Sequence, residues 1–267
     1  MNRRPIGVFD SGIGGLTVVR ALLQRLPHES LVYFGDTARV PYGNKSPETV
    51  RRYSREILDF LLARDVKLVV VACNTASAHA LAELTRVSPV PVEGVIEPGA
   101  RAAVRASRSG RIGVIGTAGT VASGAYRKAI EALDGGVEIT SQACPLFVPL
   151  VEEGWLDHTA TRLVAEAYLA PLRSHAIDTL VLGCTHYPLL KPLLAGLLGP
   201  AITLIDSADE TAAAVARRLA ASTLHAPRAV EGRAHFVVSD DPKRFVKVGK
   251  MFLGESVKDV ETVPLGC

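Results

Sequence analysis

Two short apolar runs in this chain each lead into a cysteine at a point where a helix is expected to begin. The run 68–72 leads into Cys73, and the run 180–183 leads into Cys184. Each run predicts a buried strand, and a helical pattern follows each of them. Both thiols are therefore expected at strand-to-helix junctions, the edge at which open α/β sheets place their ligands.

A second pair of motifs is spaced in nearly the same way. The strand-like run 6–9 enters a Gly-rich turn at 10–15, and the run 112–115 enters a Gly-rich turn at 116–120. These turns begin 106 positions apart, and the two cysteines are 111 positions apart. A nearly constant offset of this size indicates two related halves of domain size rather than a short repeat.

Length and composition limit the class of protein. A chain of 267 residues is long enough for about two domains. The net charge of +3 is spread along the chain without the aromatic and basic stretches of single-strand binders, so we expect no nucleic-acid partner. No apolar run reaches the roughly 18 residues of a membrane span, and no signal peptide is recognised. We therefore expect no membrane partner and a cytoplasmic location.

The cysteines do not form a disulfide or zinc pattern. Cys73, Cys144, Cys184 and Cys267 lack C-x-x-C spacing, so free thiols in a reducing compartment are expected. The Cys-x-His spacing at Cys184 and His186 is poor for tetrahedral zinc, and no metal is expected. Cys144 and Cys267 have no partner motif and are interpreted as structural or incidental.

Strand-like runs alternate with helical patterns, which predicts an α/β fold built from parallel sheets. Expected strands lie near 5–9, 31–34, 67–72, 91–95, 111–115, 137–142, 178–183, 201–205, 234–238 and 257–263. Expected helices lie near 15–26, 47–63, 75–86, 98–107, 122–133, 158–174, 188–198, 208–221 and 241–253. Ser46 is expected to cap one helix, and Ser207 with Glu210 matches a capping box for another.

Several polar segments allow two interpretations. The turn 10–15 lacks the third glycine of a dinucleotide fingerprint, and its amides either hold a small carboxylate or simply open a helix. The long connection 33–46 is typical of an ordered ligand loop. Glu152 and Glu153 lie in an expected loop, where two solvated glutamates are the plainer interpretation. His186 is equally compatible with an ordinary position at the start of a helix.

The two thiols also allow more than one role. A lone buried cysteine is most often a small hydrophobic residue, and a Cys–His nucleophile would leave the second cysteine without a role. Two thiols in equivalent places instead suit a reaction that needs one acid/base group on each face of a carbon atom. A helix N-terminus beside each thiol is expected to favour the thiolate.

Together these motifs resemble the glutamate racemases of the aspartate/glutamate racemase family, cofactor-independent enzymes of bacterial cell-wall synthesis. The matching segments span most of the chain in the family's order. They are FDSGIGGLTV at 9–18, YFGDTARVPYGNKSPE at 33–48, VACNTASA at 71–78, LVEEG at 150–154 and LGCTHYPLL at 182–190. The stretch 241–245 also resembles the family's C-terminal ending.

The resemblance implies two similar α/β domains, with mostly parallel sheets flanked by helices and the active site in the interdomain cleft. The first domain would comprise 1–96 plus 208–267, and the second 97–207. The implied activity is racemisation of L-glutamate and D-glutamate by proton transfer at Cα, without cofactor, supplying D-glutamate for peptidoglycan synthesis. The implied partner is the small-molecule substrate, and a homodimer is left open.

The resemblance also implies the site residues. Cys73 and Cys184 would be the two bases, with Cys73 serving D-glutamate and Cys184 serving L-glutamate. Asp10, Glu152 and His186 would support them. Substrate contacts are implied for Asp10, Ser11, Pro41, Tyr42, Gly43, Asn74, Thr75, Thr117, Thr120, Thr185 and His186.

Two rival classes share part of this pattern. A related two-thiol enzyme acting on aspartate, hydantoin or maleate would have the same fold and the same cysteines. A non-catalytic, two-lobed amino-acid-binding protein would need the cleft but neither thiol.

Overall fold

Strands and helices alternate along the chain, as the hydrophobic pattern predicts. The computed structural model describes residues 2–227 and 231–266. The strands are β1 (Ile6–Asp10), β2 (Leu31–Gly35), β3 (Leu68–Val71), β4 (Val92–Gly94), β5 (Arg111–Gly116), β6 (Glu138–Ala143), β7 (Thr179–Gly183), β8 (Thr203–Asp206), β9 (Ala234–Val238) and β10 (Glu261–Thr262). The α-helices are α1 (Leu16–Arg25), α2 (Pro47–Ala63), α3 (Asn74–Val87), α4 (Ile96–Ala106), α5 (Ala118–Ala122), α6 (Ala125–Glu131), α7 (Phe147–Glu152), α8 (Thr159–Ser174), α9 (Lys191–Leu198), α10 (Ser207–Ala221) and α11 (Pro242–Leu253). Short 3₁₀ turns span Thr37–Arg39, Tyr42–Asn44, Tyr187–Leu190 and Gly254–Ser256.

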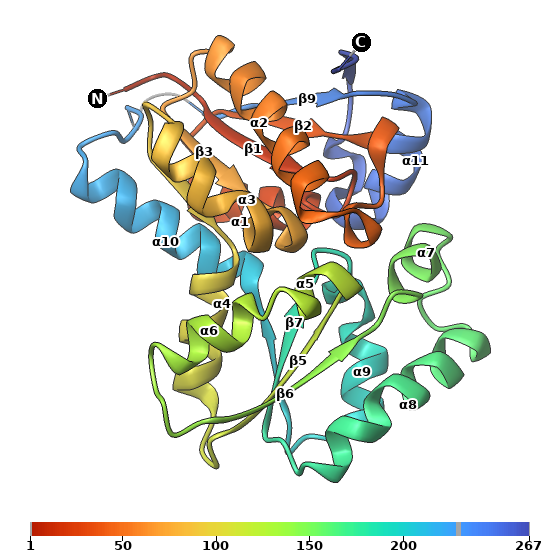
Figure 1. Cartoon of the computed structure of the whole chain (residues 1–267). Helices are drawn as coiled ribbons and strands as arrows, with labels where there is room; N and C mark the ends of the chain where they lie inside the picture. The colour runs from red at the N-terminus through yellow and green to blue at the C-terminus, as the bar shows by residue number, and fades with distance from the viewer. Residues whose placement is uncertain (1, 228–230, 267) are drawn as a thin grey trace.

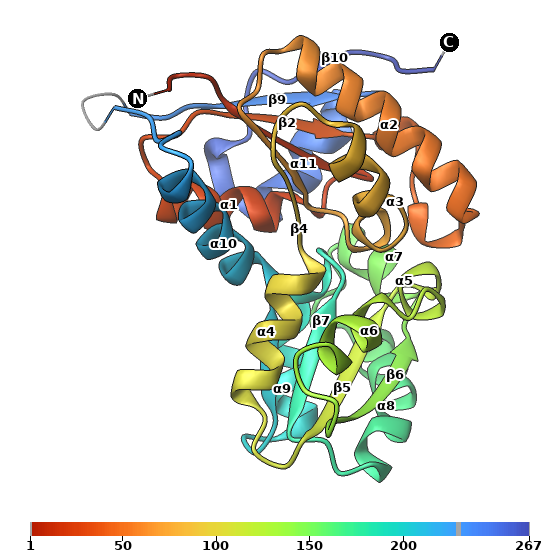
Figure 2. The same ribbon diagram turned by 60° about the vertical axis from the view of Figure 1, so that its left-hand side comes forward.

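Two separate parallel sheets organise these elements. The first has the strand order β10-β9-β2-β1-β3-β4, and the second has the order β6-β5-β7-β8. Every neighbouring pair of strands is parallel. Figures 1 and 2 show each sheet with its flanking helices as a lobe, and the two lobes lie against each other. The expectation of an α/β fold with parallel sheets flanked by helices is confirmed.

The two sheets share one internal order. The strands β2-β1-β3-β4 of the first sheet have the same spatial order as the strands β6-β5-β7-β8 of the second. β1 therefore corresponds to β5, and β3 corresponds to β7. Cys73 comes two residues after β3 ends, and Cys184 directly follows β7. The near-constant offset in the sequence thus reflects equivalent positions in two sheets of the same topology.

The C-terminal segment extends the first sheet. β9 pairs with β2 and β10 pairs with β9, while α11 packs against α1. The ring of Phe245 lies 5.9 Å from that of Tyr33 and 6.2 Å from that of Phe236, measured between centroids. Gly249 permits close contact between the helices, because a Cβ there would lie 3.0 Å from Leu16 Cδ1. These contacts fix α11 on the first lobe, where it faces α7 of the second (Figure 1).

The structure confirms one expected helix boundary and corrects two others. Ser46 caps α2 as expected, since its Oγ accepts a hydrogen bond from the Thr49 amide at 3.3 Å. The capping box at Ser207 is wrong: Asp206 accepts the Ala208 amide at 2.9 Å, and Ser207 is the first helical residue. The helix expected near 122–133 begins only at Ala125, because Gly124 adopts a left-handed φ of 63° and separates it from the short helix α5.

Two further expectations concern single segments. Glu152, expected in a loop, is the last residue of the helix α7. Cys267, interpreted as structural or incidental, lies outside the described residues. Among the helices of residues 2–227 and 231–266, none combines the length and apolarity needed to cross a bilayer.

A buried ion pair links three segments of the first lobe that are far apart in the sequence. Lys67 Nζ lies 2.5 Å from Glu29 Oε2, and the two side chains are 0% and 3% exposed. Lys67 also donates to the Asn2 carbonyl at 2.9 Å, and Glu29 Oε1 accepts the Ala226 amide at 2.8 Å. The pair thereby joins the N-terminal strand region, β3 and the segment that follows α10.

We expect Lys67→Met to lower the free energy of unfolding by about 3–5 kcal/mol, because the Glu29 carboxylate loses its buried cation and keeps only the half-exposed His225 at 3.7 Å. Denaturant unfolding followed by circular dichroism measures this loss. The control Lys128→Met removes an exposed lysine of α6 and should change stability by less than about 0.5 kcal/mol. A loss for Lys67→Met below about 1 kcal/mol, as for an exposed pair, would contradict the assignment.

Candidate active site

Cys73 caps the helix that follows β3. Its Sγ accepts the Ala76 amide at 3.5 Å and lies 3.7 Å from Ser11 Oγ. The residue is 5% exposed. This thiol is at a strand-to-helix junction, as the sequence predicts.

Cys184 occupies the equivalent strand end in different surroundings. It is followed by a 3₁₀ turn at Tyr187–Leu190, and α9 begins only at Lys191. Its side chain contacts the imidazole of His186, with Nδ1 3.9 Å from Sγ. The expectation of a helix N-terminus directly at Cys184 is therefore wrong, and a histidine takes the place of the helix amide. Cys184 is 6% exposed.

The surroundings of Cys73 oppose its ionisation. Burial, and then the negative charge of Asp10, raise the pKa of the Cys73 thiol to about 12. The expectation of a thiolate favoured by the helix N-terminus is wrong for this arrangement, because desolvation outweighs one long amide contact. Burial also raises the pKa of Asp10, although the charge of His186 and the Gly12 amide at 2.9 Å act in the opposite direction.

His186 joins Cys184 to a carboxylate. Its Nε2 lies 3.0 Å from Glu152 Oε1. Burial disfavours the imidazolium, but the contacts with Cys184 and Glu152 outweigh burial and raise the pKa of His186 to about 10. Burial likewise opposes ionisation of Glu152, yet hydrogen bonds from His186 and Arg244 lower its pKa. At neutral pH the arrangement therefore places an imidazolium–carboxylate pair beside Cys184.

The turn after β1 crosses to the second lobe. Thr185 Oγ1 lies 3.4 Å from Asp10 Oδ1, and Thr17 Oγ1 donates to the Thr185 carbonyl at 3.2 Å. Gly14 makes this approach possible, because a Cβ there would lie 2.2 Å from Thr185 Oγ1 and 2.4 Å from His186 Nδ1. The glycine in this turn is thus required by close contact with the opposite lobe.

The connection 33–46 also reaches the second lobe. Tyr42 is buried and donates a hydrogen bond to the Asp36 carboxylate. Burial, with that carboxylate, raises the pKa of Tyr42 far above its usual value, so the phenol stays protonated. Gly43 packs against Thr117, since a Cβ at Gly43 would lie 2.6 Å from Thr117 Cβ. Pro41 is exposed at the rim of this contact.

Three threonine hydroxyls meet where the lobes touch. Thr75 Oγ1 lies 2.9 Å from Thr117 Oγ1 and 3.1 Å from Thr120 Oγ1, and the latter two are 3.0 Å apart. Thr75 belongs to α3 of the first lobe, whereas Thr117 and Thr120 belong to the cap and first turn of α5. The threonines form a closed ring of hydroxyls across the interface.

Asn74 adds an unsatisfied donor beside this ring. Tyr126 donates to Asn74 Oδ1 at 2.7 Å, which fixes the orientation of the amide. The buried Asn74 Nδ2 has no hydrogen-bond partner among the described residues. A buried N–H group without a partner is costly, which makes this atom a candidate ligand contact.

Two surface pockets meet at Glu152. One, of about 350 Å³, is lined by Pro41 and Gly43 of the first lobe and by Thr117 of the second. The other, of about 470 Å³, lies between the end of α7 and the face of α11. Both cysteines are nearly inaccessible in this arrangement of the lobes.

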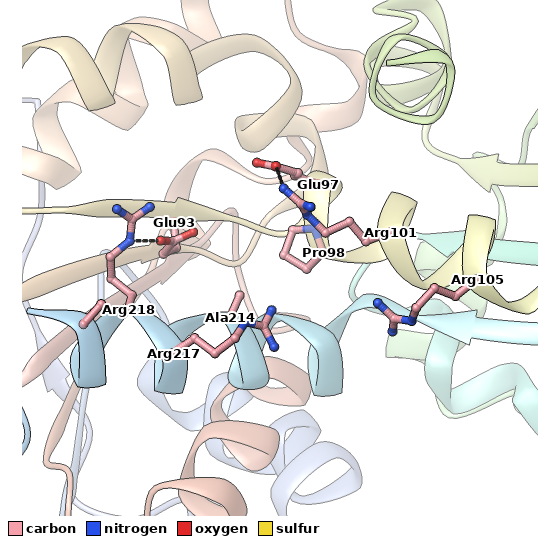
Figure 3. A pocket seen from close by; sticks show the side chains of 9 residues that line it. Glu93, Glu97, Pro98, Arg101, Arg105, Ala214, Arg217 and Arg218 are labelled. Atoms are coloured by element: carbon pink, nitrogen blue, oxygen red, sulfur yellow. Dashed lines mark hydrogen bonds and ion pairs between the residues drawn. The ribbon is translucent and has the colours of Figure 1, made fainter. Parts of the chain in front are cut away.

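A larger pocket lies where α4 and α10 meet, as Figure 3 shows. Its volume is about 620 Å³, and Arg101, Arg105, Arg217 and Arg218 line it together with Glu93 and Glu97. Ion pairs join Arg218 to Glu93 and Arg101 to Glu97. None of the residues predicted from the sequence for the site lines this pocket.

Sequence reasoning missed several residues of the site. Tyr126 donates a hydrogen bond to Asn74, and the ring of Phe252 lies 5.7 Å from that of His186, measured between centroids. Both were missed because each lies far from its partner in the sequence. Arg244 contacts Glu152. It lies in the stretch 241–245, which resembles the family's C-terminal ending but was not predicted to hold a site residue. Within the part of the chain that the structure describes, no cluster of His, Cys, Asp or Glu is placed to hold a metal ion.

We expect Gly14→Ala to force the lobes apart, because its methyl group would overlap Thr185 and His186. Both thiols should then react faster with an aromatic disulfide reagent, while stability falls by about 1–3 kcal/mol. The control Gly196→Ala adds a methyl group to α9 at a point where, apart from its own helix backbone and chain neighbours, no atom of the described residues lies within 4 Å. It should leave the labelling rate unchanged and stabilise by about 0.4–1 kcal/mol. Equal labelling rates in Gly14→Ala and the parent would contradict this close contact.

Comparison with known proteins agrees with this geometry. The chain matches the family described as Asp/Glu/Hydantoin racemase over residues 6–215. A glutamate racemase of Geobacter metallireducens is 56% identical over 262 residues, which cover 98% of this chain and 97% of the relative. The crystal structure of a glutamate racemase isoform from Bacillus anthracis has a TM-score of 0.94 at 39% identity and covers 100% of this chain and 98% of that one. That of a Francisella tularensis glutamate racemase in complex with D-glutamate has a TM-score of 0.92 at 38% identity and covers 98% of each chain. The chain is therefore a member of the Asp/Glu/Hydantoin racemase family of isomerases.

Proposed function

We propose that this protein interconverts L-glutamate and D-glutamate by removing the Cα proton on one face and returning a proton on the other. Cys73 and Cys184 are the two acid/base groups. One observation carries the proposal: the two thiols follow topologically equivalent strands of facing lobes, and each has its own ionisable neighbour. A thiol on each side of a bound carbon atom is what inversion by two bases requires.

Different ionisable groups lie beside the two thiols. On the Cys184 side, the imidazole of His186 lies within reach of the thiol and can accept or return its proton, and Glu152 holds the imidazole in place. On the Cys73 side, burial and Asp10 favour the neutral thiol that donates a proton. The α-ammonium group of the substrate adds a positive charge near Asp10, which lowers the cost of forming the Cys73 thiolate in the reverse direction.

The donors between the lobes fit the carboxylates of the substrate. Asn74 Nδ2 is buried and has no hydrogen-bond partner within residues 2–227 and 231–266, and the threonine hydroxyls can turn toward an anion. Hydrogen bonds to an α-carboxylate stabilise the negative charge that spreads onto it when Cα loses its proton. The residues proposed to contact substrate are those that the family resemblance implied, from Asp10 and Ser11 to Thr185 and His186. No step of this mechanism calls for a cofactor.

Access to the site requires domain movement. Cys73 and Cys184 are 5% and 6% exposed, so the substrate enters by separation of the lobes and reacts after they close. We propose residues 1–96 with 208–267 as one moving unit and 97–207 as the other. The chain then crosses at the start of α4 and the start of α10. We further propose that the D-glutamate formed serves peptidoglycan synthesis.

Glutamate is the proposed substrate because the relatives are named glutamate racemases and the Francisella tularensis structure holds D-glutamate. We expect kcat/KM for glutamate to exceed that for aspartate by at least about tenfold, because a missing methylene leaves the distal carboxylate short of its partners. Circular dichroism on each separate enantiomer measures inversion. Faster inversion of aspartate would overturn the substrate, and binding of glutamate without inversion would favour a binding protein.

We expect Cys73→Ser and Cys184→Ser each to reduce racemisation by about 10²-fold or more, because a hydroxyl is too weak a base. The control Cys144→Ser changes a buried thiol that no proposed step uses and should racemise within a few fold of the parent. Racemisation near the parent rate in either single-thiol variant would contradict the two-base mechanism.

Elimination of a leaving group tests each thiol separately, because it needs a base on only one face of Cα. A 3-chloroglutamate needs only proton removal: the Cα–H electron pair forms a C=C bond, chloride leaves, and the enamine hydrolyses to 2-oxoglutarate and ammonia. Cys73→Ser should retain elimination from the L-enantiomer, and Cys184→Ser from the D-enantiomer. Loss of activity on the same enantiomer in both variants would contradict the assignment of one thiol to each face.

A further inference from the structure

One face of α11 lies against the residues that surround Cys184. Arg244, Val248 and Met251 line the pocket between α11 and the end of α7, and Phe252 packs edge-on against His186. These positions recur at helical spacing, so a single face of α11 presents them all. α11 belongs to the first lobe, whereas Glu152 and His186 belong to the second.

The start of α11 fixes the place of Arg244. Asp241 is the N-cap, and its Oδ1 accepts the Arg244 amide at 2.9 Å. Pro242 occupies the first turn, where its missing N–H costs nothing. Phe245, the next residue, is buried against Tyr33. The backbone of Arg244 is thus anchored on the first lobe by a cap on one side and by the core on the other.

The side chain of Arg244 crosses to the second lobe. Its Nη2 lies 3.3 Å from Glu152 Oε2 and 3.5 Å from Glu153 Oε1. The other oxygen of Glu152 binds His186, and His186 contacts Cys184. A continuous chain of polar contacts therefore runs from the surface of one lobe to a thiol of the other.

We propose that Arg244 is a positioning residue for the half-reaction of Cys184. In the closed arrangement it holds the Glu152 carboxylate ionised and oriented toward His186, and His186 in turn acts on Cys184. This inference rests on the proposed function of the two thiols, and it assigns a role to a residue that touches neither substrate nor thiol.

The electrostatics of the pocket agree with this geometry. Although burial opposes it, His186 and Arg244 together lower the pKa of Glu152. The other charged groups that line the same pocket are Glu153, Asp241, Lys243 and Lys247, and Asp10 faces His186 from the first lobe. Removal of Arg244 raises the pKa of Glu152, so Glu152 becomes neutral at a higher pH than in the parent.

The main test compares Arg244→Gln with the parent. We expect kcat for racemisation to fall about three- to fivefold, the effect of a partly exposed ion pair. The acidic limb of the kcat–pH profile should move to higher pH, because Glu152 must stay ionised. Arg244→Lys should restore most of both. The control Lys247→Gln removes a neighbouring positive charge that does not bind Glu152 and should leave rate and profile unchanged.

Two further measurements separate positioning from a general structural effect. Elimination from L-3-chloroglutamate, the Cys184 reaction, should slow in Arg244→Gln, whereas elimination from the D-enantiomer should change less than about twofold. In a Glu152→Gln background, Arg244→Gln should have no additional effect, because its only route to Cys184 is lost. Thermal unfolding of each variant verifies that it is folded.

The outcomes distinguish this inference from the proposed function. A parent that does not racemise glutamate would overturn the function itself. A parent that racemises, with Arg244→Gln unchanged in rate and pH profile, would overturn only the role of Arg244. Equal slowing of both eliminations, or the same loss in the Glu152→Gln background, would also overturn it. Slowing confined to the D-enantiomer would support the role of Arg244 but reverse the assignment of faces.

Discussion

Parallel pairing is the constraint from which the site follows. In a parallel sheet every strand ends at the same edge, so the polar residues that follow β1 and β3 must lie together, as must those that follow β5 and β7. Two such edges are in contact here, through Thr185 with Asp10 and through Thr75 with Thr117. Neither lobe holds the full set of polar side chains, so the site exists only when both lobes are folded and apposed.

The two thiols are alike in topology but differ in chemistry. Cys73 caps a helix beside the buried carboxyl group of Asp10, whereas Cys184 faces a histidine paired with a glutamate. Such asymmetry is compatible with inversion, because the two enantiomers have equal free energies in solution. If one thiol holds its proton more tightly than the other, the populations of the two protonation states of the enzyme change. The equilibrium between L- and D-glutamate in solution does not change.

The sequence could predict the architecture and the place of the thiols because both depend on local pattern. The apolar run before Cys73 and the Ser46 cap need no information beyond a few neighbouring residues. Residues governed by distant partners were harder. Asp206 took the capping role expected of Ser207. Glu152 ends a helix that was obscured by Pro145 before it, Pro149 within it and Gly154 after it.

Electrostatics at the thiols could not be predicted from the sequence. The position of Cys73 at a helix N-terminus suggested a thiolate, but its pKa depends on how completely the opposite lobe excludes water. The role of Arg244 has the same origin. Its partner Glu152 lies in the other lobe and is more than 90 positions away, so only the folded chain brings them within 3.3 Å.

The ring formed by Thr75, Thr117 and Thr120 has a consequence for the cost of filling the site. Each hydroxyl is hydrogen-bonded to the other two, so apposing the lobes leaves no bare donor among these three groups. A hydroxyl proton moves by rotation about one C–O bond, without movement of the backbone. An anion that binds here, as proposed, therefore replaces one set of hydrogen bonds by another, and the threonine hydroxyls supply hydrogen bonds in place of its water shell.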